Sequence, residues 1–101
     1  DLVASTALAA SGCQIVLFTT GRGTPFGTFV PTAKISTNST LAANKPLWID
    51  FNAGAIVDGT PVEEVDQAFI DFVLGVASGE HTNNEKSGYS EIAIFKSGVT
   101  L

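Results

Sequence analysis

The stretch QIVLFTTGRGTPFGT, Gln14 to Thr28, predicts the fold because it joins an apolar strand to a glycine-rich loop. Its first half is a nearly continuous run of β-branched and aromatic residues, which is typical of a strand buried on both faces of a parallel sheet. Its second half carries Gly21, Gly23 and Gly27 around Arg22, the only arginine in the chain. Ligands of open α/β sheets bind at loops that follow the carboxyl ends of strands. We therefore expect a ligand site at this loop.

Helices and strands are predicted on both sides of this stretch. The alanine-rich segment before it predicts a short helix that ends at Gly12, a residue suited to a left-handed C-terminal cap. Phe29 to Thr37 predicts a second strand, NSTLAANKP predicts a polar connection with room for one helical turn, and Pro46 to Phe51 predicts a short third strand.

The clearest element is a helix that begins after residue 59. Thr60 is a suitable N-cap, Pro61 suits the first helical position, and Glu63 can complete a capping box. Apolar residues then recur at helical spacing until Gly79. HTNNEKSGYS predicts an exposed loop, and residues 91–101 predict a final strand and tail. Together these elements predict an α/β fold: a small three-layer, Rossmann-like sandwich with a mostly parallel sheet.

The composition limits the classes of function. With 101 residues and 45% hydrophobic content, residues 1–101 predict a single domain with a buried core. The net charge of −5 argues against nucleic acid or an anionic membrane as a partner. One cysteine and no visible signal peptide predict a reducing, cytoplasmic location. Because the chain has no methionine and starts at Asp1, we expect it to be a fragment of a longer protein.

The loop chemistry predicts an anion site. Glycines let backbone N–H groups face a ligand, threonines add hydroxyl groups, and Arg22 offers a planar fork to two oxygens. A carboxylate or a phosphate satisfies this set equally. The loop lacks the Gly-Lys-Ser/Thr sequence of a Walker motif, and it leads into a strand where a dinucleotide fingerprint opens a helix, so both are rejected. The alternative is a hairpin whose arginine pairs with a surface acid.

Other polar residues leave two interpretations each. Lys34 either extends along an edge strand to solvent, which we favour, or enters the cleft and binds a carboxylate or acts as a base. Asp50 and Asn52 either form Asx-turns, which we favour, or hold a substrate hydroxyl. His81 is expected to be solvated, and Cys13 to be a small core residue.

Several separated blocks resemble one family in order. TTGRGTPFG, VPTAKISTN, WIDFNAG, a helix ending VASGE and the tail AIFKSGVTL are similar to the C-terminal domain of the altronate/galactarate dehydratase family. The resemblance covers essentially the whole chain. It implies a hydro-lyase that eliminates water from a sugar acid to give a 2-keto-3-deoxy acid. It also implies a divalent cation such as iron(II) in the full-length enzyme, which this fragment is not expected to bind alone.

The resemblance and the loop chemistry together give a set of expected substrate-binding residues. They are Thr19, Thr20, Gly21, Arg22, Gly23, Thr24, Lys34, Asp50 and Asn52. The catalytic base is not identified. Expected partners are the sugar acid, other domains of the same polypeptide and a possible second copy of the protein. The alternative function is a non-catalytic domain for structure or oligomerisation, and a nucleotide-binding domain is disfavoured by the failed phosphate motifs.

Overall fold

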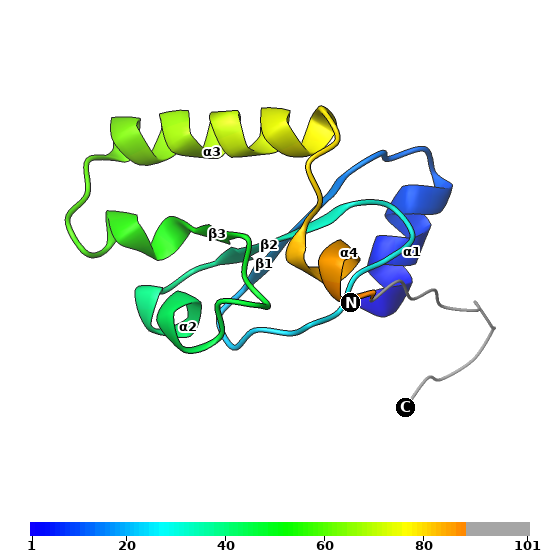
Figure 1. The fold of residues 1–101 in the computed structure, drawn as a ribbon, viewed down its shortest axis with the longest axis horizontal. Helices are drawn as coiled ribbons and strands as arrows, with labels where there is room; N and C mark the ends of the chain where they lie inside the picture. The colour runs from blue at the N-terminus through cyan, green and yellow to red at the C-terminus, as the bar shows by residue number, and fades with distance from the viewer. Residues whose placement is uncertain (89–101) are drawn as a thin grey trace.

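The computed structural model describes residues 1–88 and combines short helices with a small sheet (Figure 1). In chain order the elements are α1 (Leu2–Ala10), β1 (Val16–Thr20), β2 (Thr32–Ser36), α2 (Ser39–Asn44), β3 (Phe51–Asn52), the 3-10 helix η1 (Ala53–Ile56), α3 (Val62–Ala77) and α4 (Asn83–Ser87). The strand predicted within residues 91–101 lies outside the described residues.

The sheet has three parallel strands in the order β1-β2-β3, so β2 is the central strand. Every residue of β2 is buried. In contrast, β1 is an edge strand within residues 1–88, and Leu17 is 47% exposed. The prediction that β1 is buried on both faces is therefore wrong, because only one neighbouring strand and one covered face shield it in this part of the chain.

The register assigns each side chain to a face of the sheet. Successive side chains of a strand point to opposite faces, so Lys34 and Ser36 share a face and Ile35 lies on the other. Partners in register lie side by side, and Ser36 aligns with Thr20 of β1 and Asn52 of β3. Thr20, Ser36 and Asn52 consequently form one polar row across the carboxyl ends of all three strands.

Helix α3 packs against the apolar face of the sheet at its β3 edge. The ring of Phe51 in β3 lies 5.2 Å from that of Phe69 and 5.6 Å from that of Phe72, centroid to centroid. Val65 and Val76 are buried along the same side of α3. Figure 1 shows α3 along one side of the sheet and α1 and α4 on the other. The predicted α/β class with a parallel sheet is confirmed.

Two predicted boundaries are wrong at the ends of α3 and β3. Pro61 is the N-cap of α3, and Val62 is its first helical residue. The predicted cap at Thr60 and the predicted first helical position at Pro61 are therefore each one residue too early. The third strand is shorter than predicted because the N–H of Trp48 donates to the carbonyl of Lys45 at 3.0 Å, which turns the chain there.

The predicted helix ends at Gly12 and Gly79 are confirmed. The predicted exposed loop after Gly79 is wrong in part, because it contains a short helix. Gly12 and Gly79 both have a φ of 109°, a left-handed conformation that suits glycine. Residues 83–87 form α4, which begins with a capping box between Thr82 and Glu85. Thr82 is 1% exposed, so this segment packs into the domain.

Candidate functional site

The loop that follows β1 is fixed to the carboxyl edge of the sheet. The N–H of Gly23 donates to the hydroxyl of Thr20 at 2.9 Å. The carbonyl of Thr20 accepts from the N–H of Thr37 at 3.1 Å, and the carbonyl of Gly21 accepts from the side-chain amide of Asn38 at 3.1 Å. The first part of the loop is therefore held by the residues that follow β2, as expected for a strand-end site.

Arg22 is exposed at the tip of this held segment. Within residues 1–88 its guanidinium forms no ion pair or hydrogen bond, so the alternative in which it pairs with a surface acid is not supported there. The Thr24 hydroxyl is partly occupied, because it accepts the N–H of Phe26 at 3.2 Å. Thr19 is exposed and, by strand alternation, faces the side opposite to Thr20. The loop thus presents the Arg22 side chain, with Thr19 on the other face, whereas the Gly23 N–H expected to face a ligand is bound to Thr20.

Gly23 brings the loop against two residues that the sequence did not place at the site. A Cβ built on Gly23 would lie 3.5 Å from the Cδ of Lys45 and 3.5 Å from the ring of Trp48. The ammonium of Lys45 lies 4.3 Å from the centroid of the Trp48 ring, a cation–π distance. The sequence signal available for this pair is the Lys-Pro-Leu-Trp stretch, in which the sequence predicts that Lys45 ends a polar connection and Trp48 lies in a strand.

Asn52 stabilises the turn after β3. Its side-chain oxygen accepts the N–H of Gly54 at 2.9 Å, which confirms the predicted Asx-turn. Its amide donates to the Ser39 hydroxyl at 3.0 Å, and Ser39 donates in turn to Asp58. These contacts tie β3 to the start of α2.

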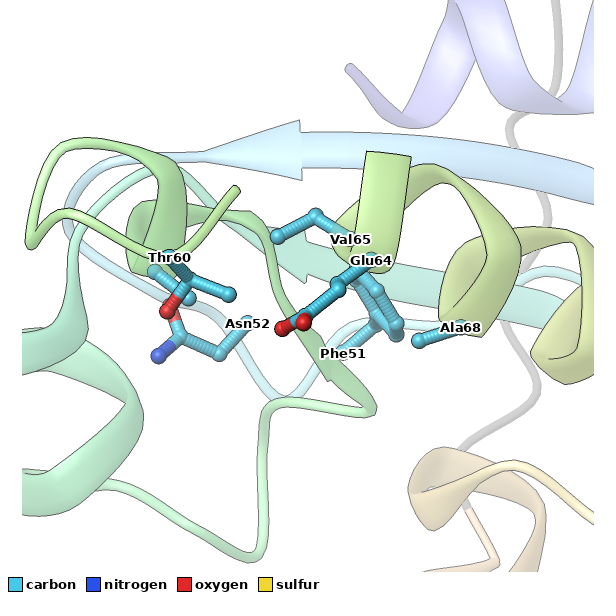
Figure 2. A pocket seen from close by; sticks show the side chains of 7 residues that line it. Phe51, Asn52, Thr60, Glu64, Val65 and Ala68 are labelled. Atoms are coloured by element: carbon cyan, nitrogen blue, oxygen red, sulfur yellow. The ribbon is translucent and has the colours of Figure 1, made fainter. Parts of the chain in front are cut away.

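A hollow of about 330 Å³ adjoins Asn52 on the side of α3. Figure 2 shows the Glu64 carboxylate directed toward the space between Asn52 and Phe51, with Thr60 beside Asn52. The lining residues are Phe51, Asn52, Ala55, Thr60, Glu64, Val65 and Ala68. Of the expected substrate-binding residues, Asn52 is the one that borders this hollow.

Lys34 lies in the middle of β2 and is 0% exposed, so the favoured interpretation of an edge-strand lysine is wrong. Its ammonium donates to the carbonyls of Phe26 at 2.6 Å and Pro25 at 3.3 Å. Burial lowers the pKa of Lys34 from its usual 10.5, and the negative charge of Asp50 opposes that shift in part. The lysine therefore holds Pro25 and Phe26, which lie in the second half of the glycine-rich loop around Arg22, called the arginine loop from here on.

Asp50 binds two backbone N–H groups and does not form an Asx-turn. One carboxylate oxygen accepts from Lys34 at 2.8 Å, and the other accepts from Asn83 at the start of α4 at 2.7 Å. The structure thus divides the expected set in two. Arg22 and its loop neighbours, with Asn52, lie at the carboxyl edge, whereas Lys34 is buried beneath the loop and Asp50 is half-buried beside it. Whether each residue binds substrate stays a prediction.

The other candidate residues lie on the surface. Cys13 is exposed, so its predicted place in the core is wrong, because it follows the turn at Gly12 and precedes β1. His81 is exposed, as expected. No three His, Cys, Asp or Glu side chains among residues 1–88 are grouped so as to hold a metal ion. The donors present there do not fit the divalent cation implied by the resemblance. None of the helices within residues 1–88 has the length and apolar character to cross a membrane.

The fold and the loop define a class of protein: a small α/β domain with a guanidinium at the carboxyl edge of a parallel sheet. Residues 1–100 match the family described as D-galactarate/altronate dehydratase, C-terminal, and the chain belongs to this family. The resemblance found in the sequence is therefore confirmed.

The individual relatives that the chain resembles are altronate and galactarate dehydratases. The chain is 63% identical over 102 residues to an altronate dehydratase of Bacillus subtilis (strain 168) and 55% identical over 101 residues to one of Escherichia coli (strain K12), both across its whole length. It is 40% identical over 99 residues, 94% of its length, to the galactarate dehydratase (L-threo-forming) of Escherichia coli (strain K12). The chain spans 20%, 20% and 19% of these three relatives. It corresponds to one domain of much longer enzymes.

Proposed function

We propose that this chain acts as the C-terminal domain of a sugar-acid dehydratase and supplies a carboxylate-binding wall of its active site. The substrate is altronate or galactarate, and the product is a 2-keto-3-deoxy acid. The family and the names of the relatives support the hydro-lyase class. The observation that carries the binding role is Arg22, which is exposed and without a partner within residues 1–88, at the carboxyl edge of the sheet.

The chemistry explains why a fixed cation is useful. A base removes the proton α to the carboxylate, the β-hydroxyl leaves as water, and the resulting enol tautomerises to the keto acid. Removal of the α-proton places a second negative charge beside the carboxylate, so preorganised positive charge lowers the barrier. A guanidinium can bind both carboxylate oxygens at once. In this proposal Arg22 grips the carboxylate, and the hydrogen bond from Gly23 to Thr20 holds the loop in place.

The base comes from elsewhere in the longer enzyme. Among the described residues, His81 is exposed and does not line the hollow beside Asn52, and the ammonium of Lys34 already binds two carbonyls. We also propose that a divalent cation such as iron(II) is bound by other domains of a cytoplasmic enzyme. The partners of this domain are then those domains, the sugar acid and a second copy of the protein.

The test is kinetic and uses the full-length enzyme. Arg22→Ala and Arg22→Lys should both raise KM steeply, because losing a buried bidentate charge contact costs about 2–5 kcal/mol. Lys86→Ala is the matched control, since Lys86 is an exposed cation on α4. Unchanged KM and kcat in both Arg22 variants would remove Arg22 from the site.

A second candidate function is a structural or oligomerisation domain. It is favoured by exposed apolar side chains: Phe29 is 51% exposed, Leu47 76% and Leu74 59%. Such residues are typical of surfaces that another protein surface covers. This function predicts that Leu74→Glu changes the oligomeric state of the full-length enzyme in sedimentation velocity, whereas Arg22→Ala leaves both the oligomeric state and KM unaltered.

A further inference from the structure

We propose that Lys45 is a second substrate-binding cation, which acts beside Arg22 on the same carboxylate end of the sugar acid. This inference rests on the proposed function and names a residue outside the expected substrate-binding set. It is carried by the contact of Lys45 and Trp48 with Gly23, and by the hollow that these two side chains line.

The contact places Lys45 next to the arginine loop. Gly23 has a φ of 88°, and a Cβ there would lie 2.8 Å from Leu41 and 3.5 Å from both Lys45 and Trp48. The positive φ favours glycine here, and Lys45 and Trp48 lie at ordinary contact distance from the built Cβ. The aliphatic stem of Lys45 therefore packs one residue away from Arg22, although the two cations are 23 positions apart in the sequence.

The ammonium of Lys45 is held in place without a carboxylate partner. Lys45 ends α2, where its N–H donates to the carbonyl of Leu41 at 2.9 Å. Its ammonium lies 4.3 Å from the centroid of the Trp48 ring, which attracts the positive charge without neutralising it. Within residues 1–88 no acidic side chain forms an ion pair with it. Its charge is thus available to an anion.

A hollow of about 280 Å³ provides space for the ligand beside this pair. It is lined by Asn44, Lys45, Pro46, Leu47 and Trp48. The backbone of this wall is fixed from α4, because the Asn83 amide donates to the carbonyl of Ile49 at 2.9 Å and to that of Pro46 at 3.2 Å.

The chemistry of the wall fits a hydroxylated carboxylate. The Lys45 ammonium is a compact point charge that complements the planar fork of Arg22. The Trp48 ring offers an apolar face to the C–H groups of a sugar chain, and the exposed Asn44 amide is available to its hydroxyls. The charge of Lys45 in this wall favours an anion over a neutral sugar.

The experiment compares KM and kcat of the full-length enzyme for altronate and galactarate in five variants, one of which is Arg22→Ala. Lys45→Met removes the charge but keeps the stem over Trp48, and Lys45→Ala removes both. Lys45→Arg restores the charge, and Lys86→Ala is the control cation on α4. We expect Lys45→Met and Lys45→Ala to raise KM about 10- to 100-fold, as for a lost hydrogen bond to a charged group. Lys45→Arg should stay within about threefold of the parent, and Lys86→Ala should match it.

Salt provides a readout that a purely structural role would not change. The KM of the parent should rise with ionic strength more steeply than that of Lys45→Met, because one screened attraction is missing in the variant. A KM within twofold of the parent in Lys45→Met, while Arg22→Ala raises KM, overturns the role of Lys45 and leaves the proposed function standing. A raised KM in Lys45→Met with no effect of Arg22→Ala overturns the role of Arg22 and the shared carboxylate, and leaves Lys45 as the binding cation. No effect of either change overturns both.

Discussion

Lys34 and Asp50 are joined twice: the N–H of Lys34 donates to the Asp50 carboxylate at 2.8 Å, and the N–H of Asp50 donates to the Lys34 carbonyl at 2.9 Å. This pair extends the contact between β2 and β3 before the short ladder of β3 begins. Because the other Asp50 oxygen accepts from Asn83, the same carboxylate connects the sheet to α4. One acidic side chain therefore links three segments beneath the arginine loop.

Asp50→Asn should destabilise the domain. The amide keeps one acceptor oxygen and places an NH₂ group against the second backbone N–H, so one partly buried donor loses its partner. We expect the free energy of unfolding to fall by about 1.5–3 kcal/mol, measured by urea denaturation of the 101-residue chain. Asp66→Asn on the exposed side of α3 is the control, with an expected change within about 0.5 kcal/mol. Equal stability of the two variants would contradict a bridging role for Asp50.

Lys34 should make the stability depend on pH in the alkaline range. Burial lowers the pKa of Lys34 in the folded state below the 10.5 of the unfolded chain. Between these two values the unfolded state binds the extra proton, so the free energy of unfolding rises with pH. The stability that Lys34 contributes is complete above pH 10.5 and is lost as the pH falls through the pKa of Lys34 in the folded state.

The comparison with Lys34→Met isolates this contribution, because the other titrating groups are common to both chains. The stability difference between parent and variant, taken from urea denaturation at several pH values, should shift in favour of the parent as pH rises. A difference that stays constant across the alkaline range would show that the pKa of Lys34 is unaltered by folding.

Gly27→Ala should disturb the contact between the arginine loop and α4. A Cβ on Gly27 would lie 1.9 Å from the amide nitrogen of Asn84, a residue that is 2% exposed. Relieving this overlap requires Asn84 to move, and we expect a loss of about 1–3 kcal/mol in stability. Gly21→Ala in the same loop is the matched control, since its Cβ would meet Thr37 at an ordinary 3.4 Å. Thermal unfolding should place Gly27→Ala below Gly21→Ala, and the reverse order would contradict the packing.

Phe69→Ala should cost more than Ile70→Ala, although the two residues are adjacent on α3. Phe69 packs its ring against Phe51 and Phe72, whereas Ile70 is 51% exposed. Truncating a packed phenylalanine typically costs about 3–5 kcal/mol, and the half-buried position of Phe69 favours the lower end. Urea denaturation of both variants measures the difference. Equal losses of stability in the two variants would mean that α3 does not pack against β3 through Phe69.

Local sequence patterns predicted the elements that depend on short-range physics. The apolar run before Thr20 and the alternating segment around Lys34 became strands, and Gly12 and Gly79 ended the first helix and α3. The patterns failed where distant residues decide the outcome. The segment after His81 folds into α4 because its own capping box is joined by the hydrogen bond from Asn83 to Asp50, 33 positions away.

The sequence by itself determined that a strand runs into a glycine-rich loop with a single arginine, because apolar periodicity and backbone freedom are local properties. Only the tertiary structure decided which charged residues lie near that loop. The order β1-β2-β3 buries Lys34 in the central strand, and the turn after α2 brings Lys45 against Gly23. Strand order and close backbone approach are relations between distant segments, so no local pattern in the chain encodes them.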